Sequence, residues 1–112
     1  DHRVGLSREQ EIERECLIWL NKEVGFFWKN ASVGIYDQAA GSYRKGNVFQ
    51  INGVSDIIGL DQCGNVYFIE VKTNTGVQSL VQLAFEKQIK KHKGNYILVR
   101  SLEELKREFG GE

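Results

Sequence analysis

The sequence predicts one α/β domain, residues 1–112, in which helices flank a mixed β-sheet. The first observation is the order of hydrophobic patterns along the chain, which reads αβββαβα. The second is the unit at residues 66–99, where a helical pattern separates two strand patterns; such a unit forms a right-handed parallel crossover. The third is the absence of proline, repeats and low-complexity tracts, which leaves no linker between domains.

Three segments read as helices because each begins with a serine that is followed three residues later by Gln or Glu, the pattern of a capping box. In the first segment, apolar side chains recur at helical spacing and form one stripe. Gly25 and Gly94 follow the first two segments and are expected to end them. The segments are residues 7–24 (Ser7, Gln10), residues 79–93 (Ser79, Gln82) and a short final helix that starts at Ser101 with Glu104.

Apolar, β-rich runs predict the strands at residues 26–30, 54–61, 65–72 and 96–99, and residues 34–46 read as a long loop or a ragged strand. Residues 62–64 separate the second strand from the third. This spacing fits a three-residue hairpin loop with glycine in the left-handed conformation. The third strand carries apolar residues on both faces, so we expect it to be central in the sheet.

Composition excludes several classes of function. Lys and Arg balance Asp and Glu at 15 each, so the net charge gives no argument for a nucleic-acid partner. No apolar run is long enough to span a membrane, and no signal-peptide pattern is present, so no membrane partner is expected. The two cysteines, Cys16 and Cys63, match no zinc spacing and make a poor disulfide framework. A reducing, cytoplasmic setting is therefore expected.

The hairpin brings together three charged residues. If Asp61 faces Asn65 across the loop, counting back five positions on each strand puts Asp56 opposite Glu70. Directly opposed residues have Cβ atoms about 5 Å apart on one face of a sheet. Lys72 follows Glu70 by two residues and projects from the same face.

Two carboxylates at this separation repel each other unless one is protonated or a cation lies between them. Mg²⁺ or Mn²⁺, which prefer oxygen ligands, are suitable occupants, and the backbone carbonyl of Val71 is a candidate for a further ligand. Lys72 is then placed to bind a phosphate or to position an attacking water. The alternative is a structural cluster in which Lys72 neutralises Asp56 and Glu70 on a solvated face. The apolar neighbours Ile58 and Phe68 weigh against it, because burying charge is costly unless the charge is paired or ligates a metal.

The chain resembles the VRR-NUC (virus-type replication–repair nuclease) domain of the PD-(D/E)XK nuclease superfamily. The motifs that carry the resemblance are residues 53–59 (GVSDIIG), 68–73 (FIEVKT) and 79–82 (SLVQ), with supporting similarity at residues 9–12, 26–30 and 94–101. A bare D…ExK pattern is weak, whereas the full ordered set covers nearly the whole chain. Ser55 departs from the proline that often precedes the aspartate in this superfamily.

The resemblance implies a restriction-endonuclease-like core with Asp56 and Glu70 as metal ligands and Lys72 as the catalytic lysine. It also implies a glutamate on the first helix. The candidates are Glu9, Glu11 and Glu13. Helical geometry favours Glu9 as the one that faces the sheet, because it lies between core positions on the apolar stripe, whereas Glu13 lies at the edge of the stripe and Glu11 points away. The resemblance then implies that Glu9 is a metal ligand, directly or through water. A first-turn carboxylate favoured by the helix dipole is the alternative for Glu9. Gln82 matches the family's glutamine that orients the lysine or a phosphate, and it is equally well explained as part of its capping box.

The activity that the resemblance implies is Mg²⁺- or Mn²⁺-dependent cleavage of branched DNA. Stand-alone members of this length look like phage or bacterial enzymes that act on four-way (Holliday) junctions, so a homodimer in the cytoplasm of a bacterial or phage-infected cell is expected. A flap- or single-strand-selective nuclease and a non-catalytic DNA-binding module are the alternatives. Candidate DNA contacts, each with a plain surface role as the alternative, are Tyr43, Arg44, Lys45, Lys87, Lys90 and Lys91.

Overall fold

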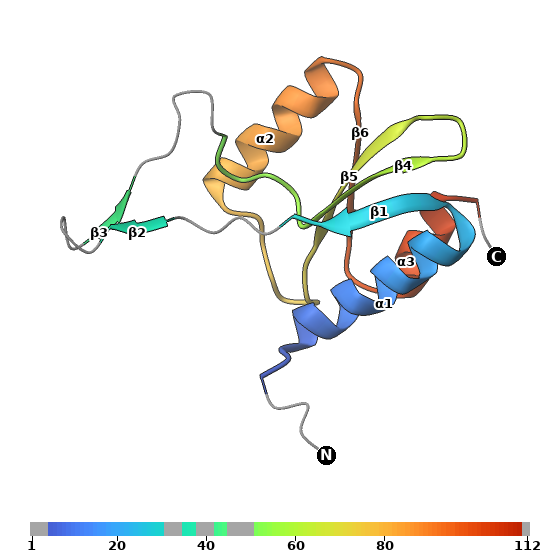
Figure 1. The fold of residues 1–112 in the computed structure, drawn as a ribbon, viewed down its shortest axis with the longest axis horizontal. Coiled ribbons are helices and arrows are strands. Elements are labelled where there is room, and N and C mark those ends of the chain that lie inside the picture. Colours follow the sequence, from blue (N-terminus) through green and yellow to red (C-terminus); the bar gives the residue numbers. More distant parts are fainter. Residues whose placement is uncertain (1–4, 31–34, 38–41, 45–50, 111–112) are drawn as a thin grey trace.

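The computed structural model describes residues 5–30, 35–37, 42–44 and 51–110. Figure 1 shows how the helices and strands of this part of the chain are arranged. The elements are α1 (Arg8–Glu23), β1 (Gly25–Lys29), β2 (Ile35–Asp37), β3 (Ser42–Arg44), β4 (Ile57–Asp61), β5 (Val66–Val71), α2 (Leu80–Lys91), β6 (Asn95–Val99) and α3 (Leu102–Glu108).

Four strands form a mixed sheet in the order β1-β4-β5-β6, so the predicted α/β class with helices on a mixed sheet is confirmed. β4 is antiparallel to both β1 and β5. β5 and β6 are parallel neighbours, and α2 connects them in the sequence. The predicted αβββαβα order describes this sheet and its helices. β2 and β3 form a separate antiparallel pair. In the sequence they lie between β1 and β4, in the segment that is predicted to be a long loop or a ragged strand.

The predicted helix starts are confirmed, and one helix end is placed differently. Ser7 and Ser79 are the N-caps of α1 and α2, and each forms a complete capping box with the glutamine three residues on. At the end of α2 the left-handed residue is Lys93, with φ of +68°, rather than Gly94. Lys93 N–H donates to the Lys90 carbonyl and Gly94 N–H donates to the Ile89 carbonyl, which together form a Schellman motif.

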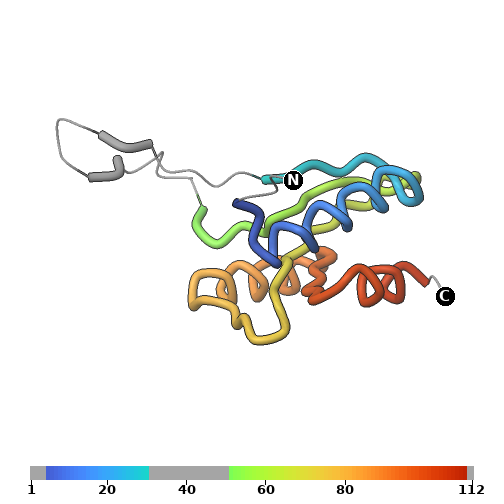
Figure 2. The backbone as a smooth tube through the Cα atoms, turned by 90° about the horizontal axis from the view of Figure 1, so that it is seen from below, coloured from blue at the N-terminus to red at the C-terminus, as the bar shows by residue number. Residues whose placement is uncertain are grey.

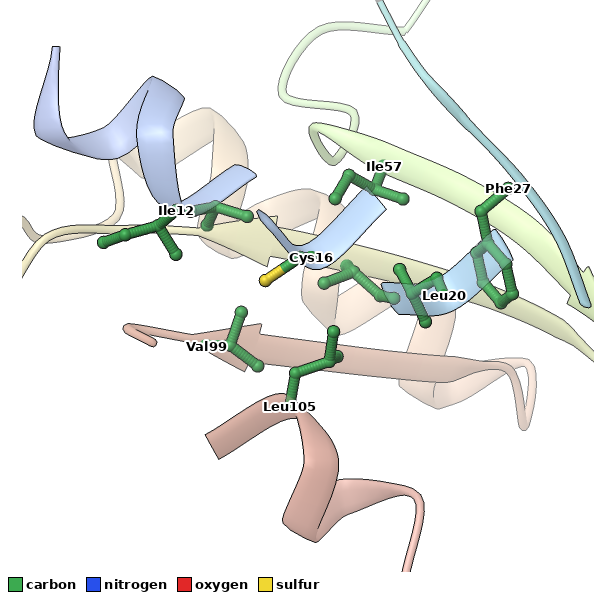
Figure 3. Packing of buried hydrophobic residues seen from close by; sticks show 9 residues of the cluster. Ile12, Cys16, Leu20, Phe27, Ile57, Val99 and Leu105 are labelled. Atoms are coloured by element: carbon green, nitrogen blue, oxygen red, sulfur yellow. The ribbon is translucent and has the colours of Figure 1, made fainter. Parts of the chain in front are cut away.

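One face of the sheet carries the main hydrophobic core, on which α1 and α3 lie together (Figure 1). Figure 3 shows side chains of α1 meeting those of the strands and of α3. The fully buried members of this core share the alternate positions of the strands that point toward α1 and α3, as period-2 patterning requires. They include Cys16 and Leu20 on α1, Ile57 on β4, Ile69 and Val71 on β5, Val99 on β6 and Leu105 on α3.

The opposite face of β5 and β6 is covered by α2. Phe85 of α2 packs edge-on against Phe68 of β5, with ring centroids 5.4 Å apart, and also contacts Tyr96 of β6. The alternation of residues along β5 therefore places Glu70 on the α2 side, beyond Phe68. β5 is covered on both faces, as its sequence predicts, and a charged residue on it is consequently buried.

β4 begins at Ile57, three residues later than the sequence predicts, because residues 53–56 pass close to the start of α2 instead of pairing as a strand. Gly53 has φ of +80°, and a Cβ atom there would collide with the carbonyl group of Val81. Only glycine allows this close approach of the backbone to α2. Asp56 therefore belongs to the segment that immediately precedes β4 and is not part of the strand. None of the helices in the described part of the chain is long and apolar enough to cross a membrane.

Candidate active site

The β4–β5 hairpin has the predicted loop at residues 62–64. Asp61 N–H donates to the Asn65 carbonyl at 3.0 Å, and the Asp61 carboxylate accepts hydrogen bonds from Cys63, Asn65 and Tyr67. These bonds, the side-chain bond to Asn65 above all, lower the pKa of Asp61 to about 2. A carboxylate that stays ionised at this turn holds the register of the hairpin.

The register brings Asp56 and Glu70 together, as predicted. Ile57 pairs with Ile69, so one further step along the same register sets Asp56 across from Glu70. The Asp56 carbonyl accepts a hydrogen bond from Asn30 N–H at 2.7 Å, and its Oδ2 accepts one from Val71 N–H at 2.9 Å. Asp56 is therefore fixed between the end of β1 and the end of β5.

Glu70 is the most buried charged residue of the site, with 1% of its surface exposed. Its Oε2 accepts a hydrogen bond from Gln82 Nε2 at 3.1 Å and lies 3.8 Å from Lys72 Nζ. Its Oε1 is buried without a hydrogen-bond partner among the described residues. Burial first, and then the negative charge of Asp56, raises the pKa of Glu70 to about 8, while Lys72 opposes this shift.

These observations fit a hard divalent cation. An acceptor atom without a partner in a buried carboxylate costs free energy that a metal ion bound there would offset. The described residues contain no group of three or more His, Cys, Asp and Glu side chains that could hold a metal ion. A Mg²⁺-type site does not need one, because such ions are held by one or two carboxylates and complete their coordination with water and substrate phosphate.

Lys72 and Gln82 both contact Glu70. The Lys72 side chain is only 13% exposed, and its distance from Glu70 is too long for a hydrogen bond, so the ammonium has donors left for a substrate. The capping-box role predicted for Gln82 is confirmed, because Oε1 accepts from Ser79 N–H at 2.9 Å. Nε2 donates to Glu70, and the predicted orienting of Lys72 or of a phosphate stays a prediction. The contact of Gln82 is with Glu70 rather than with Lys72.

The glutamates of α1 differ from the helical-wheel expectation in one respect. Glu13, and not Glu9, is the buried one, and its carboxylate pairs with Lys29 Nζ of β1 at 2.8 Å. The reason is that α1 packs mainly across β1, which offers a cation to Glu13. Glu9 is half-buried, and its charge contributes to the raised pKa of Glu70. The first turn of α1 lies beside the segment that follows β5 (Figures 1 and 2). The metal-ligand role predicted for Glu9 stays a prediction.

The candidate DNA contacts belong to different parts of the chain. Lys87 and Lys91 are exposed on α2, whereas Lys90 forms an ion pair with Glu86 at 2.6 Å and is partly neutralised. Tyr43 and Arg44 belong to β3, which fits the ragged strand that is one of the two predictions for this segment, and Tyr43 pairs with Tyr36. Lys45 lies outside the described residues.

The sequence reasoning gives no role to two residues beside the site. Ser55 is fully buried, and its Oγ has no hydrogen-bond partner among the described residues. The pKa of Tyr96 is raised, first by burial and next by the charge of Glu70. Tyr96 pairs with Phe68 across the parallel strands, so the alternation along residues 96–99 was the signal that could have placed it on the face of Glu70.

Comparisons of the chain with protein-family models, with curated proteins and with solved structures gave no match. Function is therefore inferred from the geometry of the site and from the sequence motifs.

Proposed function

We propose that this protein is a metal-dependent, structure-selective DNA endonuclease with a restriction-endonuclease-like core. The observation that carries the proposal is Glu70, a buried carboxylate with one oxygen unpartnered among the described residues, set across from Asp56 and beside the ammonium of Lys72. The order of these residues in the chain, with Gln82 on the next helix, is that of the nuclease motifs to which the sequence is similar.

The residues divide the chemistry among them. Asp56 and Glu70 would hold Mg²⁺ or Mn²⁺, with the Val71 carbonyl and Glu9 as candidate further ligands. A cation there supplies a water of lowered pKa and offsets charge that develops on phosphate oxygens. Gln82 keeps one oxygen of Glu70 in place by hydrogen bonding. Lys72 binds the scissile phosphate or orients the attacking water. Because its side chain is only slightly exposed, water screens its charge less than it would at the surface.

The substrate proposed is branched DNA, with four-way junctions as the favoured form. This choice comes from the resemblance to stand-alone nucleases of this length. Because a four-way junction has two equivalent strands to cut, a homodimer with two-fold symmetry would place one site on each strand. Lys87 and Lys91, which are exposed on α2, are candidate contacts to the DNA backbone.

The test is cleavage of an immobile four-way junction in Mn²⁺, compared with cleavage of linear duplex, flap and single-stranded DNA of matched sequence. We expect the wild type to cut the junction. We expect three variants to lose cutting and to retain binding to the junction: Asp56→Asn, Glu70→Ala and Lys72→Ala. Each removes a group that the proposed reaction needs and leaves the exposed lysines of the surface unchanged.

The matched control is Lys22→Ala, which removes an exposed lysine from the last turn of α1 and leaves the site intact. Cleavage by Glu70→Ala at any metal concentration would show that Glu70 is not a ligand. A wild type that binds the junction and never cuts it, in either metal, would leave a DNA-binding module in place of a nuclease.

A further inference from the structure

Two basic residues, Lys72 and Arg100, follow the ends of the neighbouring strands β5 and β6. Val71 pairs with Val99 in the parallel register, and the next residues along the two strands are Lys72 and Arg100. Lys72 N–H donates to the Val99 carbonyl at 3.0 Å, which carries the pairing one step past the strands. Only Lys72 has a place in the chemistry proposed above, so the contacts of Arg100 need an explanation of their own.

Arg100 holds the turn that follows Lys72. Its Nη1 donates hydrogen bonds to the carbonyl oxygens of Thr73 and Gly76, the latter at 2.7 Å. Gly76 N–H in turn donates to the Thr73 carbonyl at 3.2 Å, which closes the turn. Arg100 N–H donates to Glu104 Oε1 at 2.7 Å, so Arg100 itself is fastened to the start of α3.

This turn lies near the aliphatic part of Lys72, with room for about one methyl group between Gly76 and Lys72 Cδ. A Cβ atom at Gly76 would be 3.5 Å from Lys72 Cδ and 3.3 Å from Thr73 Oγ1. A turn held this close limits the space open to a side chain whose four-carbon stem otherwise samples many rotamers. The Lys72 ammonium beyond it remains 3.8 Å from Glu70 Oε2.

We propose that Arg100 is a positioning residue for Lys72. By holding residues 73–76 close to the lysine stem, it limits where that stem can move and so keeps the ammonium beside Glu70. The consequence for catalysis depends on the proposed nuclease function, whereas the effect on Lys72 itself does not. An arginine suits this task because one nitrogen, Nη1, donates to both carbonyl oxygens along directions that the planar guanidinium fixes, whereas the donors of a lysine ammonium rotate freely.

The first measurement follows the accessibility of Lys72 without any DNA. Folded protein is treated with an amine-acylating reagent, and the rate of modification at each lysine is read by peptide mass spectrometry. In Arg100→Met we expect Lys72 to react severalfold faster than in the wild type, while the exposed Lys22 keeps its rate. Arg107→Met, which removes an exposed arginine of α3, is the matched control and is expected to leave the rate at Lys72 unchanged.

The second measurement is cleavage of the four-way junction. Arg100→Met is expected to lower kcat between about 10- and 100-fold with little change in KM, since a misplaced lysine affects the transition state more than DNA binding. Arg100→Lys is expected to restore part of the rate. If Arg100→Met does not fold, Arg100→Lys carries both measurements, because it keeps the charge and loses the fixed donor directions of the planar guanidinium.

The two proposals fail separately. A wild type that does not cut DNA ends the nuclease proposal and leaves the labelling comparison standing. An unchanged labelling rate at Lys72 in a folded Arg100 variant overturns the role of Arg100. Faster labelling with an unchanged kcat overturns it as well, because the placement of Lys72 would then have no bearing on the reaction.

Discussion

Glu70 occupies an environment that opposes its charge. It is buried between the sheet and α2, the Asp56 carboxylate lies across from it, and one of its oxygens has no partner among the described residues. Its raised pKa of about 8 means that the folded, metal-free protein holds this proton more tightly than the unfolded chain does. Stability contributed by the protonated form is therefore full below its ordinary pKa of 4.5 and is lost as pH rises toward 8.

We predict that the free energy of unfolding of the metal-free protein falls across this pH window and that Glu70→Gln removes most of the fall. Urea denaturation in a chelator, at the two ends of the window, measures it. Addition of Mn²⁺ at the upper end is expected to restore stability to the wild type and not to Glu70→Gln, because ligands stabilise the state that binds them. Equal pH slopes for the two proteins would mean that Glu70 does not titrate in this range.

Gln82 links the start of α2 to the site through a single amide group. We predict that Gln82→Ala moves the pH profile of cleavage to higher pH, because a hydrogen bond to the ionised carboxylate is removed and the pKa of Glu70 rises further. Ser79→Ala is the control. It removes the hydroxyl that accepts from Gln82 N–H and is expected to cost about 1 kcal/mol of stability without moving the profile. A shift in both variants would attribute the effect to the helix start.

At the scale of elements, the placement of α2 depends on the close approach of Gly53. A Cβ atom there would collide with the backbone of Val81 and Gln82, and the residue has a positive φ. Gly64 in the hairpin loop has a nearly identical φ of +84° but nothing within 4 Å of the position of a Cβ. The two glycines therefore separate backbone strain from steric contact.

We predict that Gly64→Ala costs about 1 kcal/mol of stability from left-handed strain alone. Gly53→Ala is expected to cost roughly 1–3 kcal/mol more, because the added methyl group must also displace the first turn of α2. Thermal and urea unfolding give both values. Cleavage at a temperature where both variants are folded should fall only in Gly53→Ala, since Gln82 moves with that turn. Equal costs for the two substitutions would contradict the close approach.

The hairpin register could be predicted from sequence because a short loop with glycine at the left-handed position admits few pairings, and the register then determines which residues are opposed. The capping boxes were likewise predictable, since they depend on residues three apart. The burial of Glu13 could not be predicted from a helical wheel, because it depends on Lys29 of β1, which tertiary packing brings to α1. The contact of Gln82 with Glu70 and the approach of Gly53 to α2 also join distant segments, so no local pattern carries them.

For the whole molecule, the balance of 15 basic and 15 acidic residues means that attraction to DNA depends on where charges lie. Two of the acidic residues, Glu13 and Glu70, are buried, so their carboxylates do not face DNA from the protein surface. On α2, Lys87 and Lys91 face solvent, while Lys90 is paired with Glu86. All three lysines are exposed, but only Lys90 forms an ion pair with a described residue, so Lys87 and Lys91 are better placed to meet phosphate groups.

We predict that replacing Lys87 and Lys91 by glutamine weakens junction binding and reduces the slope of log K against log salt by about two, or about one for each phosphate that is no longer neutralised. Lys90→Gln is expected to change the slope less, because its ion pair already offsets the charge. Fluorescence anisotropy with a labelled junction, in a chelator that prevents cleavage, gives these slopes. A double variant with the slope of the wild type would place the DNA on another face.

Joint binding of one divalent cation by Asp56 and Glu70 is the property from which the proposed chemistry follows. Electron paramagnetic resonance of Mn²⁺ tests it most directly, because the signal of the free ion falls as the ion binds. The wild type is expected to deplete the free-ion signal, whereas Asp56→Asn and Glu70→Gln, both folded, are expected to leave most of it. A wild type that leaves the signal unchanged, or a Glu70→Gln variant that depletes it equally well, would contradict joint binding.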